Sequence, residues 1–159
     1  MNKMTKNELR IGNYVYYEHT THVVSGVHGN SVYSWWVKDG KPVIEYEAKD
    51  SSGTQVEAPY MDVVSQHEPI PLTEEWLEKL GLIKRNQTEE LPEELQQPDI
   101  DEDGDIWYTW VKGVFNLEIQ SNGEIWFELY SHYKHIKWVH ELQNLYIALT
   151  EEELTLQEK

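Results

Sequence analysis

The segment DIDEDGD, residues 99–105, is the part of the sequence best suited to bind a metal ion, because four of its residues are alternating aspartates. Alternating carboxylates followed by glycine are typical of the first half of a calcium loop. A helix–loop–helix calcium site also needs a bidentate glutamate at its last position, which here is Trp110, and Pro98 interrupts an incoming helix. An acidic turn that leads into a strand is therefore the alternative interpretation. The calcium hypothesis, restricted to low-affinity binding, involves Asp99, Asp101, Asp103 and Asp105.

The remaining reactive residue types do not form a recognisable catalytic or metal motif. The chain has seven histidines and no cysteine, and zinc needs three or four converging ligands. His135 and His140 are five positions apart in a predicted helix, so they do not share a face. The sequence contains neither a nucleophile elbow nor a glycine-rich phosphate loop. We expect no catalytic residues and no cofactor, although the many carboxylates leave enzymatic activity open.

The charge is strongly negative and unevenly distributed. The 159-residue chain has a formal net charge of −16, and the segment 89–105 holds nine acidic residues and no basic one. Such a surface repels phosphates, so we expect neither direct nucleic-acid binding nor attachment to acidic membranes. No stretch is apolar enough to span a membrane, and the first residues lack the apolar segment of a secretory signal. We therefore expect a cytoplasmic protein.

Large aromatic side chains are the second unusual feature, with seven Trp and ten Tyr against two Phe. Trp35 and Trp36 are adjacent in a predicted strand, so their rings must face opposite sides. Exposed rings of this kind can anchor a protein partner or stack on sugars or bases, whereas a second core layer is the alternative. The predicted partner-binding surface combines rings with acidic residues: Glu89, Glu90, Glu93, Glu94, Asp99, Asp101, Glu102, Asp103, Trp35, Trp36, Trp107 and Trp126.

The first part of the chain, residues 1–66, is predicted to be a β subdomain. Runs rich in β-branched and aromatic residues predict strands at 13–18, 22–27, 31–37, 42–48 and 60–64. Asp39-Gly40 is typical of a type I′ hairpin turn, because both residues accept a positive φ. Short strands at this spacing predict a small SH3-like β-barrel or a curled antiparallel sheet.

The second part, residues 67–159, is predicted to mix helices with a sheet in one compact unit with the first. A helix within 69–82 should begin after Thr73 and end at Gly81, and an acidic loop should follow at 84–105. Alternating apolar residues then predict a three-stranded meander at 105–112, 114–120 and 124–130. A helix at about 135–149 should pack on the meander, and Thr150 with Glu153 predicts a short final helix. The expected class is α+β.

Three segments carry a family resemblance: LRIGNYV (9–15), HEPIPLTEEWLEKLGL (67–82) and IKWVHELQNLYIALTEEELTL (136–156). They resemble an uncharacterised family of small proteins from phages, prophages and mobile elements of Bacteroides-type bacteria. The resemblance implies a mobile-element context in a bacterial host and no catalytic residues. Within the third segment, Gln143 and Asn144 are polar helix residues that either satisfy buried backbone groups or contact a partner.

These features favour a non-enzymatic accessory protein of a phage or mobile element that acts by binding another protein. The negative field favours a basic partner, and one specific form is a nucleic-acid mimic that inhibits a host protein. The alternative is a module that binds a small molecule or a divalent metal ion. Unpaired aromatic faces also leave a homodimer open.

Overall fold

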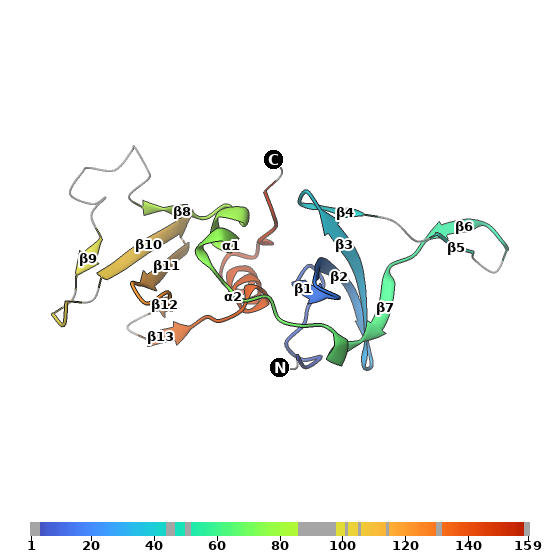
Figure 1. Cartoon of the computed structure of the whole chain (residues 1–159), viewed down its shortest axis with the longest axis horizontal. Helices are drawn as coiled ribbons and strands as arrows, with labels where there is room; N and C mark the ends of the chain where they lie inside the picture. The colour runs from blue at the N-terminus through green and yellow to red at the C-terminus, as the bar shows by residue number, and fades with distance from the viewer. Residues whose placement is uncertain are drawn as a thin grey trace. The chain divides into compact units, whose positions relative to one another are not determined.

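The computed structural model describes residues 4–43, 47–49, 52–85, 98–100, 102–104, 106–113, 115–129 and 132–157. The chain divides into two compact units: unit 1 comprises Met1–Ile70 with Trp138–Lys159, and unit 2 comprises Pro71–Lys137. Each unit contains an antiparallel sheet, and the described residues form one long helix (Figure 1). The α+β class expected from the sequence is confirmed. We expected 1–66 and 67–159 to be the two parts, whereas the structure groups the last 22 residues of the chain with the first part.

Unit 1 is built on a five-stranded antiparallel sheet with the order β1-β2-β3-β4, and β7 pairs with the first half of β3. The strands predicted at 13–18, 22–27, 31–37 and 60–64 are present, whereas the strand predicted at 42–48 is matched in this sheet only at its start, and residues 44–46 lie outside the described residues. The bounds are β1 Tyr14–Tyr17, β2 Thr20–His28, β3 Ser31–Lys38, β4 Lys41–Val43 and β7 Tyr60–Val63. A separate two-stranded ribbon pairs β5 Glu47–Lys49 with β6 Gln55–Glu57. Among the described strands the sheet stays open at β1 and β4, so the predicted closed barrel is wrong and the alternative of an antiparallel sheet is correct.

Two tight turns set the register of this sheet. Asp39 and Gly40 have φ values of 51° and 80°, and they join Lys38 to its partner Lys41. The predicted hairpin turn with positive φ is therefore confirmed. Glu18 and His19, between β1 and β2, also have positive φ values, of 48° and 65°. No glycine marks this second turn in the sequence.

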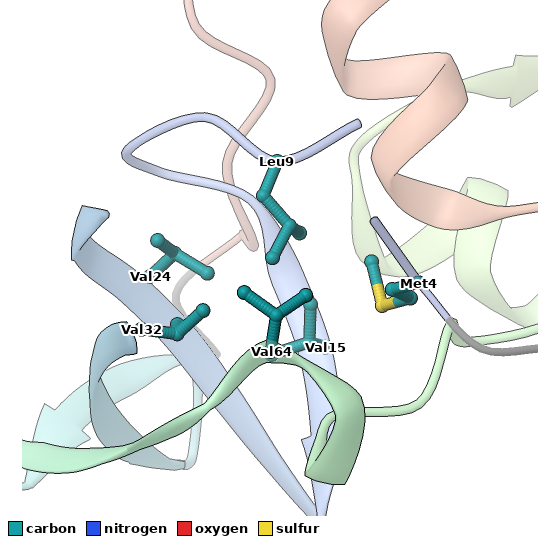
Figure 2. Close-up of a cluster of buried hydrophobic side chains, with 6 residues drawn as sticks. All are labelled: Met4, Leu9, Val15, Val24, Val32 and Val64. Carbon is teal, nitrogen blue, oxygen red and sulfur yellow. The ribbon is translucent and has the colours of Figure 1, made fainter. Parts of the chain in front are cut away.

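The core of unit 1 is an aliphatic cluster beneath the sheet (Figure 2). Val15, Val24 and Val32 lie on three neighbouring strands and are at most 1% exposed. Val64 is the first residue of η1 (Val64–Gln66), a single 3-10 turn. Its side chain and that of Leu9 point toward the three valines, with Met4 at the edge of the cluster. Alternation places these side chains on one sheet face, which is why the strand pattern could be read from the sequence.

Helix α2, Val139–Thr150, belongs to unit 1 and contacts β1. We expected this helix to begin near 135 and to pack on the meander, but residues 132–135 form a strand of unit 2 instead. The helix begins where the Glu141 carboxylate accepts a hydrogen bond from the Trp138 backbone N–H at 3.2 Å. The predicted short final helix is wrong. Thr150 donates its hydroxyl to the Tyr146 carbonyl within α2, Glu151 takes a positive φ of 61°, and residues 153–157 are not helical.

Unit 2 contains a six-stranded antiparallel sheet with the order β13-β12-β11-β10-β8, and β9 pairs with β10. The bounds are β8 Ile83–Lys84, β9 Asp99–Ile100, β10 Ile106–Lys112, β11 Phe115–Gln120, β12 Ile125–Leu129 and β13 His132–His135. The predicted meander corresponds to β10, β11 and β12 and is confirmed. The sequence patterns did not reveal β8, β9 or β13, which are short strands of two to four residues.

One face of this sheet forms the core of unit 2. Trp110, Leu117 and Ile119 are at most 1% exposed, and the Phe115 and Phe127 rings stack with centroids 5.2 Å apart. Helix α1, Glu74–Lys79, begins as predicted at Thr73, whose hydroxyl accepts a hydrogen bond from the Trp76 N–H at 3.4 Å. The helix buries Trp76 and Leu77. Among the described helices, none has the length and apolar character needed to cross a membrane.

Candidate functional site

The face of the unit 2 sheet opposite this core carries aromatic and acidic side chains. Residues that pair directly across antiparallel strands project to the same face. Asp99 pairs with Trp107, Glu118 pairs with Trp126, and Trp126 in turn pairs with His135. Because Leu117, Ile119 and Phe127 occupy the buried face, their sequence neighbours Glu118 and Trp126 must lie on the outer one. We call this surface the outer face.

An open groove of about 490 Å³ lies on the outer face. Its lining comes from five strands, β9 to β13. Glu118 lies on the central strand β11, and a Trp residue lies on each of the flanking strands β10 and β12. The lining residues are Asp99, Ile100, Trp107, Glu118, Trp126 and Tyr133. The volume is within the range of about 300 to 1,000 Å³ that is typical of ligand-binding pockets. We call this site the aromatic groove.

The carboxylates around the aromatic groove repel one another. Glu118 is half-buried, and its pKa is raised first by burial and then by the negative charges of Glu128 and Asp99. Glu128 pairs with Tyr133 across β12 and β13, and together with Glu118 it raises the pKa of the Tyr133 phenol. None of the residues that line the groove is Lys or Arg. The groove therefore has a negative field that a positively charged ligand would neutralise.

The aromatic side chains of the groove differ in how far they are exposed to solvent. The Trp126 ring stacks on the His135 ring, with centroids 4.8 Å apart and an angle of 19° between the planes. This contact supports one side of the indole, and its Nε1 atom is buried without a hydrogen-bond partner in the described structure. Tyr133 is 58% exposed and Ile100 is 67% exposed, so the groove rim offers apolar surface to solvent. An indole that is supported on one side and has exposed neighbours can stack on a flat ligand group.

The structure brings together only part of the predicted partner-binding surface. Asp99, Trp107 and Trp126 line the aromatic groove. Glu102 and Asp103 are exposed in the turn before β10 but do not line it. Trp35 and Trp36 lie on β3 of unit 1, where both are half-buried, and neither lines the groove. The remaining predicted positions, Glu89, Glu90, Glu93, Glu94 and Asp101, lie outside the described residues.

Glu118 and Tyr133 are groove residues that the sequence prediction of binding residues missed. The alternation in β11 places Glu118 on the polar face of its strand, but it does not indicate which residues stand opposite it. Tyr133 fell in a segment next to a predicted helix, and its role depends on β13. The pairing register of the strands decides that both residues line the groove. That register depends on contacts between strands and not on the local sequence.

No metal centre is visible among the described residues. There, no three His, Asp or Glu side chains group closely enough to hold an ion. Two aspartates of the calcium hypothesis, Asp101 and Asp105, lie outside the described residues, so calcium binding stays a prediction. Asp99 belongs to β9, and Asp103 precedes Gly104, whose φ is 86°. This described part of the segment is an acidic turn that joins two paired strands, as in the alternative interpretation.

Two buried histidines in unit 1 form a second cluster of titratable groups. His22 is 2% exposed, its Nε2 lies 3.0 Å from the Thr20 hydroxyl, and its Nδ1 lies 3.1 Å from the Ser34 hydroxyl. Burial and then the positive charge of protonated His67 lower the pKa of His22 to about 4. The Tyr17 ring contacts both histidine rings, with centroids 5.4 Å and 5.2 Å away. Both ring nitrogens of His22 are engaged and the ring is covered, so this cluster is a packed core feature.

The polar helix residues of α2 connect segments of unit 1. Gln143 accepts a hydrogen bond from the Tyr14 N–H at 2.8 Å and donates to the carbonyls of Gly12 and Leu154 at 3.0 Å each. Asn144 accepts from the Asn13 side-chain amide at 3.0 Å. These residues were predicted either to satisfy buried backbone groups or to contact a partner. The first interpretation is confirmed for Gln143.

Comparisons with protein-family models, with curated proteins and with solved structures gave no match to this chain.

Proposed function

We propose that this protein is a non-enzymatic binding protein that attaches to a basic protein partner through the aromatic groove. The observation that carries the proposal is the convergence on one sheet face of two Trp, one Tyr and the carboxylates of Asp99 and Glu118, with no Lys or Arg in the lining. Aromatic side chains are enriched among the residues that dominate binding energy at protein interfaces. The negative field adds attraction and orientation for a positively charged partner.

The resemblance to proteins of phages and mobile elements suggests the biological setting. In that setting the protein acts in the cytoplasm of a bacterial host as an accessory factor. A specific form of the proposal is a nucleic-acid mimic, in which the carboxylates occupy a surface of a host protein that otherwise contacts phosphates. The net charge of −16 supports a partner of opposite sign but does not identify it.

A small-molecule-binding module is the second candidate function. The volume of the groove, about 490 Å³, would accommodate a ligand of drug size. A sugar ring would stack on Trp107 or Trp126, and the carboxylates would accept hydrogen bonds from its hydroxyl groups. This candidate does not use the net negative charge, which is why we place protein binding first.

The test is affinity capture from a bacterial host lysate with the wild-type protein and two matched variants. Trp126→Ala removes a ring of the groove, and Glu118→Gln removes a groove charge. Glu124→Gln is the control, because it removes the same charge from an exposed position in the turn between β11 and β12.

We expect a basic protein that is captured by the wild type and by the control, and that is lost or strongly reduced with both groove variants. Its affinity should fall as ionic strength rises, because salt screens charge attraction. Capture that is equal for all four proteins, or the absence of any captured basic protein at low salt, would refute the proposal.

A further inference from the structure

The positions of the aromatic groove residues restrict what chemical group the groove can hold. Glu118 lies on β11, directly opposite Trp126 on β12. Trp107 on β10 pairs with Gln120, so it is the diagonal neighbour of Glu118 on the other side. Neighbouring strands are about 4.8 Å apart, which places β10 and β12 about 10 Å from each other. One carboxylate therefore lies between two indoles in the lining of the open groove.

The charges around Glu118 indicate the sign of that group. Asp99 on β9 and Glu128 on β12 both destabilise the ionised form of Glu118, and they act on a carboxylate that is already half-buried. The described lysines of β8, β10 and β13 are engaged elsewhere or face the other side, whereas His135 of β13 lies on the outer face behind the Trp126 ring. Lys84 lies over the Tyr108 ring at 3.8 Å, and Lys112 donates to the Leu80 carbonyl at 2.6 Å. Lys134 pairs with the inward-facing Phe127.

From this geometry we infer that the aromatic groove is a recognition site for an arginine side chain of the protein partner. The inference rests on the proposed function and specifies the partner group that enters the groove. A guanidinium is planar, stacks on indole faces and donates parallel hydrogen bonds to a carboxylate. The Glu118 carboxylate accepts these hydrogen bonds, and the Trp107 and Trp126 rings cover the faces of the guanidinium. An ammonium group is more strongly hydrated and has no flat face, so lysine matches the groove less well.

The experiment uses hexa-arginine and hexa-lysine peptides, which carry equal charge, as probes for the full chain. The side-chain N–H signals of tryptophan in ¹⁵N-labelled protein are followed by NMR, and the Trp107 and Trp126 signals are assigned with Phe variants. We expect hexa-arginine to shift these two signals and to bind roughly tenfold more tightly than hexa-lysine. Glu118→Gln, which keeps the side-chain size, should weaken hexa-arginine binding roughly tenfold. Glu124→Gln should bind like the wild type.

Three outcomes would overturn the inference. Equal affinity for the two peptides would mean that the groove responds to charge alone. Shifts confined to Trp35 and Trp36 would place the peptide on unit 1. A response to cellobiose without a response to hexa-arginine would assign the groove to a sugar. Loss of the arginine preference leaves the proposed function intact if partner capture still depends on Trp126, so the two tests can fail separately.

Discussion

Replacing Gln143 with leucine tests a polar side chain that links α2 to other segments of unit 1. The amide of Gln143 is 6% exposed and makes three hydrogen bonds, to the Tyr14 N–H and to the carbonyls of Gly12 and Leu154. Leucine has a similar size but can satisfy none of these backbone groups. Each buried polar group that loses its partner costs about 1–3 kcal/mol, and the apolar gain of leucine offsets part of this. We therefore expect Gln143→Leu to lower the free energy of unfolding by about 3 kcal/mol.

The measurement is urea unfolding followed by far-UV circular dichroism, with Asn144→Leu as the control on the neighbouring position of α2. Asn144 is half-buried, and its bond to the Glu8 carbonyl lies in an exposed region. Water can replace the lost partners there, so we expect a loss of about 1 kcal/mol. A loss below about 1 kcal/mol for Gln143→Leu, or equal losses for both variants, would refute the reasoning that buried backbone groups depend on Gln143.

Two further predictions concern the packing of unit 1. Unfolded His22 binds a proton near pH 6.5 but the folded form only near pH 4, so stability should decrease by about 3 kcal/mol as the pH falls through this interval. Chemical unfolding across this range should show that slope, His22→Gln should reduce it, and an equal slope in both proteins would contradict the assignment. Gly40→Ala should cost about 1–2 kcal/mol, because φ is 80° and the new Cβ would lie 3.3 Å from the Gln157 carbonyl. Gly29→Ala, with φ of 60° and no atom within 4 Å of the new Cβ, is the control for thermal unfolding and should lose less.

Local sequence signals predicted most strands of both sheets because the cause of strand alternation is local. A strand with one buried face alternates apolar and polar residues, as Phe115, Leu117 and Ile119 do in β11. The cap at Thr73 and the turn at Asp39-Gly40 also depend on residues within four positions. The same kind of local signal wrongly predicted a short helix after Thr150. Its hydroxyl bonds to the preceding helical turn, and Leu154 is 2% exposed in the core of unit 1.

The sequence by itself therefore determined the α+β class, most strands, the start of α1, and the abundance of aromatic and acidic residues. Only the tertiary structure decided which of these residues meet. Trp107, Glu118, Trp126 and Tyr133 come from four strands, and the pairing register places them in one groove. It also decided that α2 joins β1 in unit 1, because the Gln143 side chain has its partners at Gly12 and Tyr14. Registers and long-range hydrogen bonds depend on residues far apart in the chain, whereas periodicity records only near neighbours.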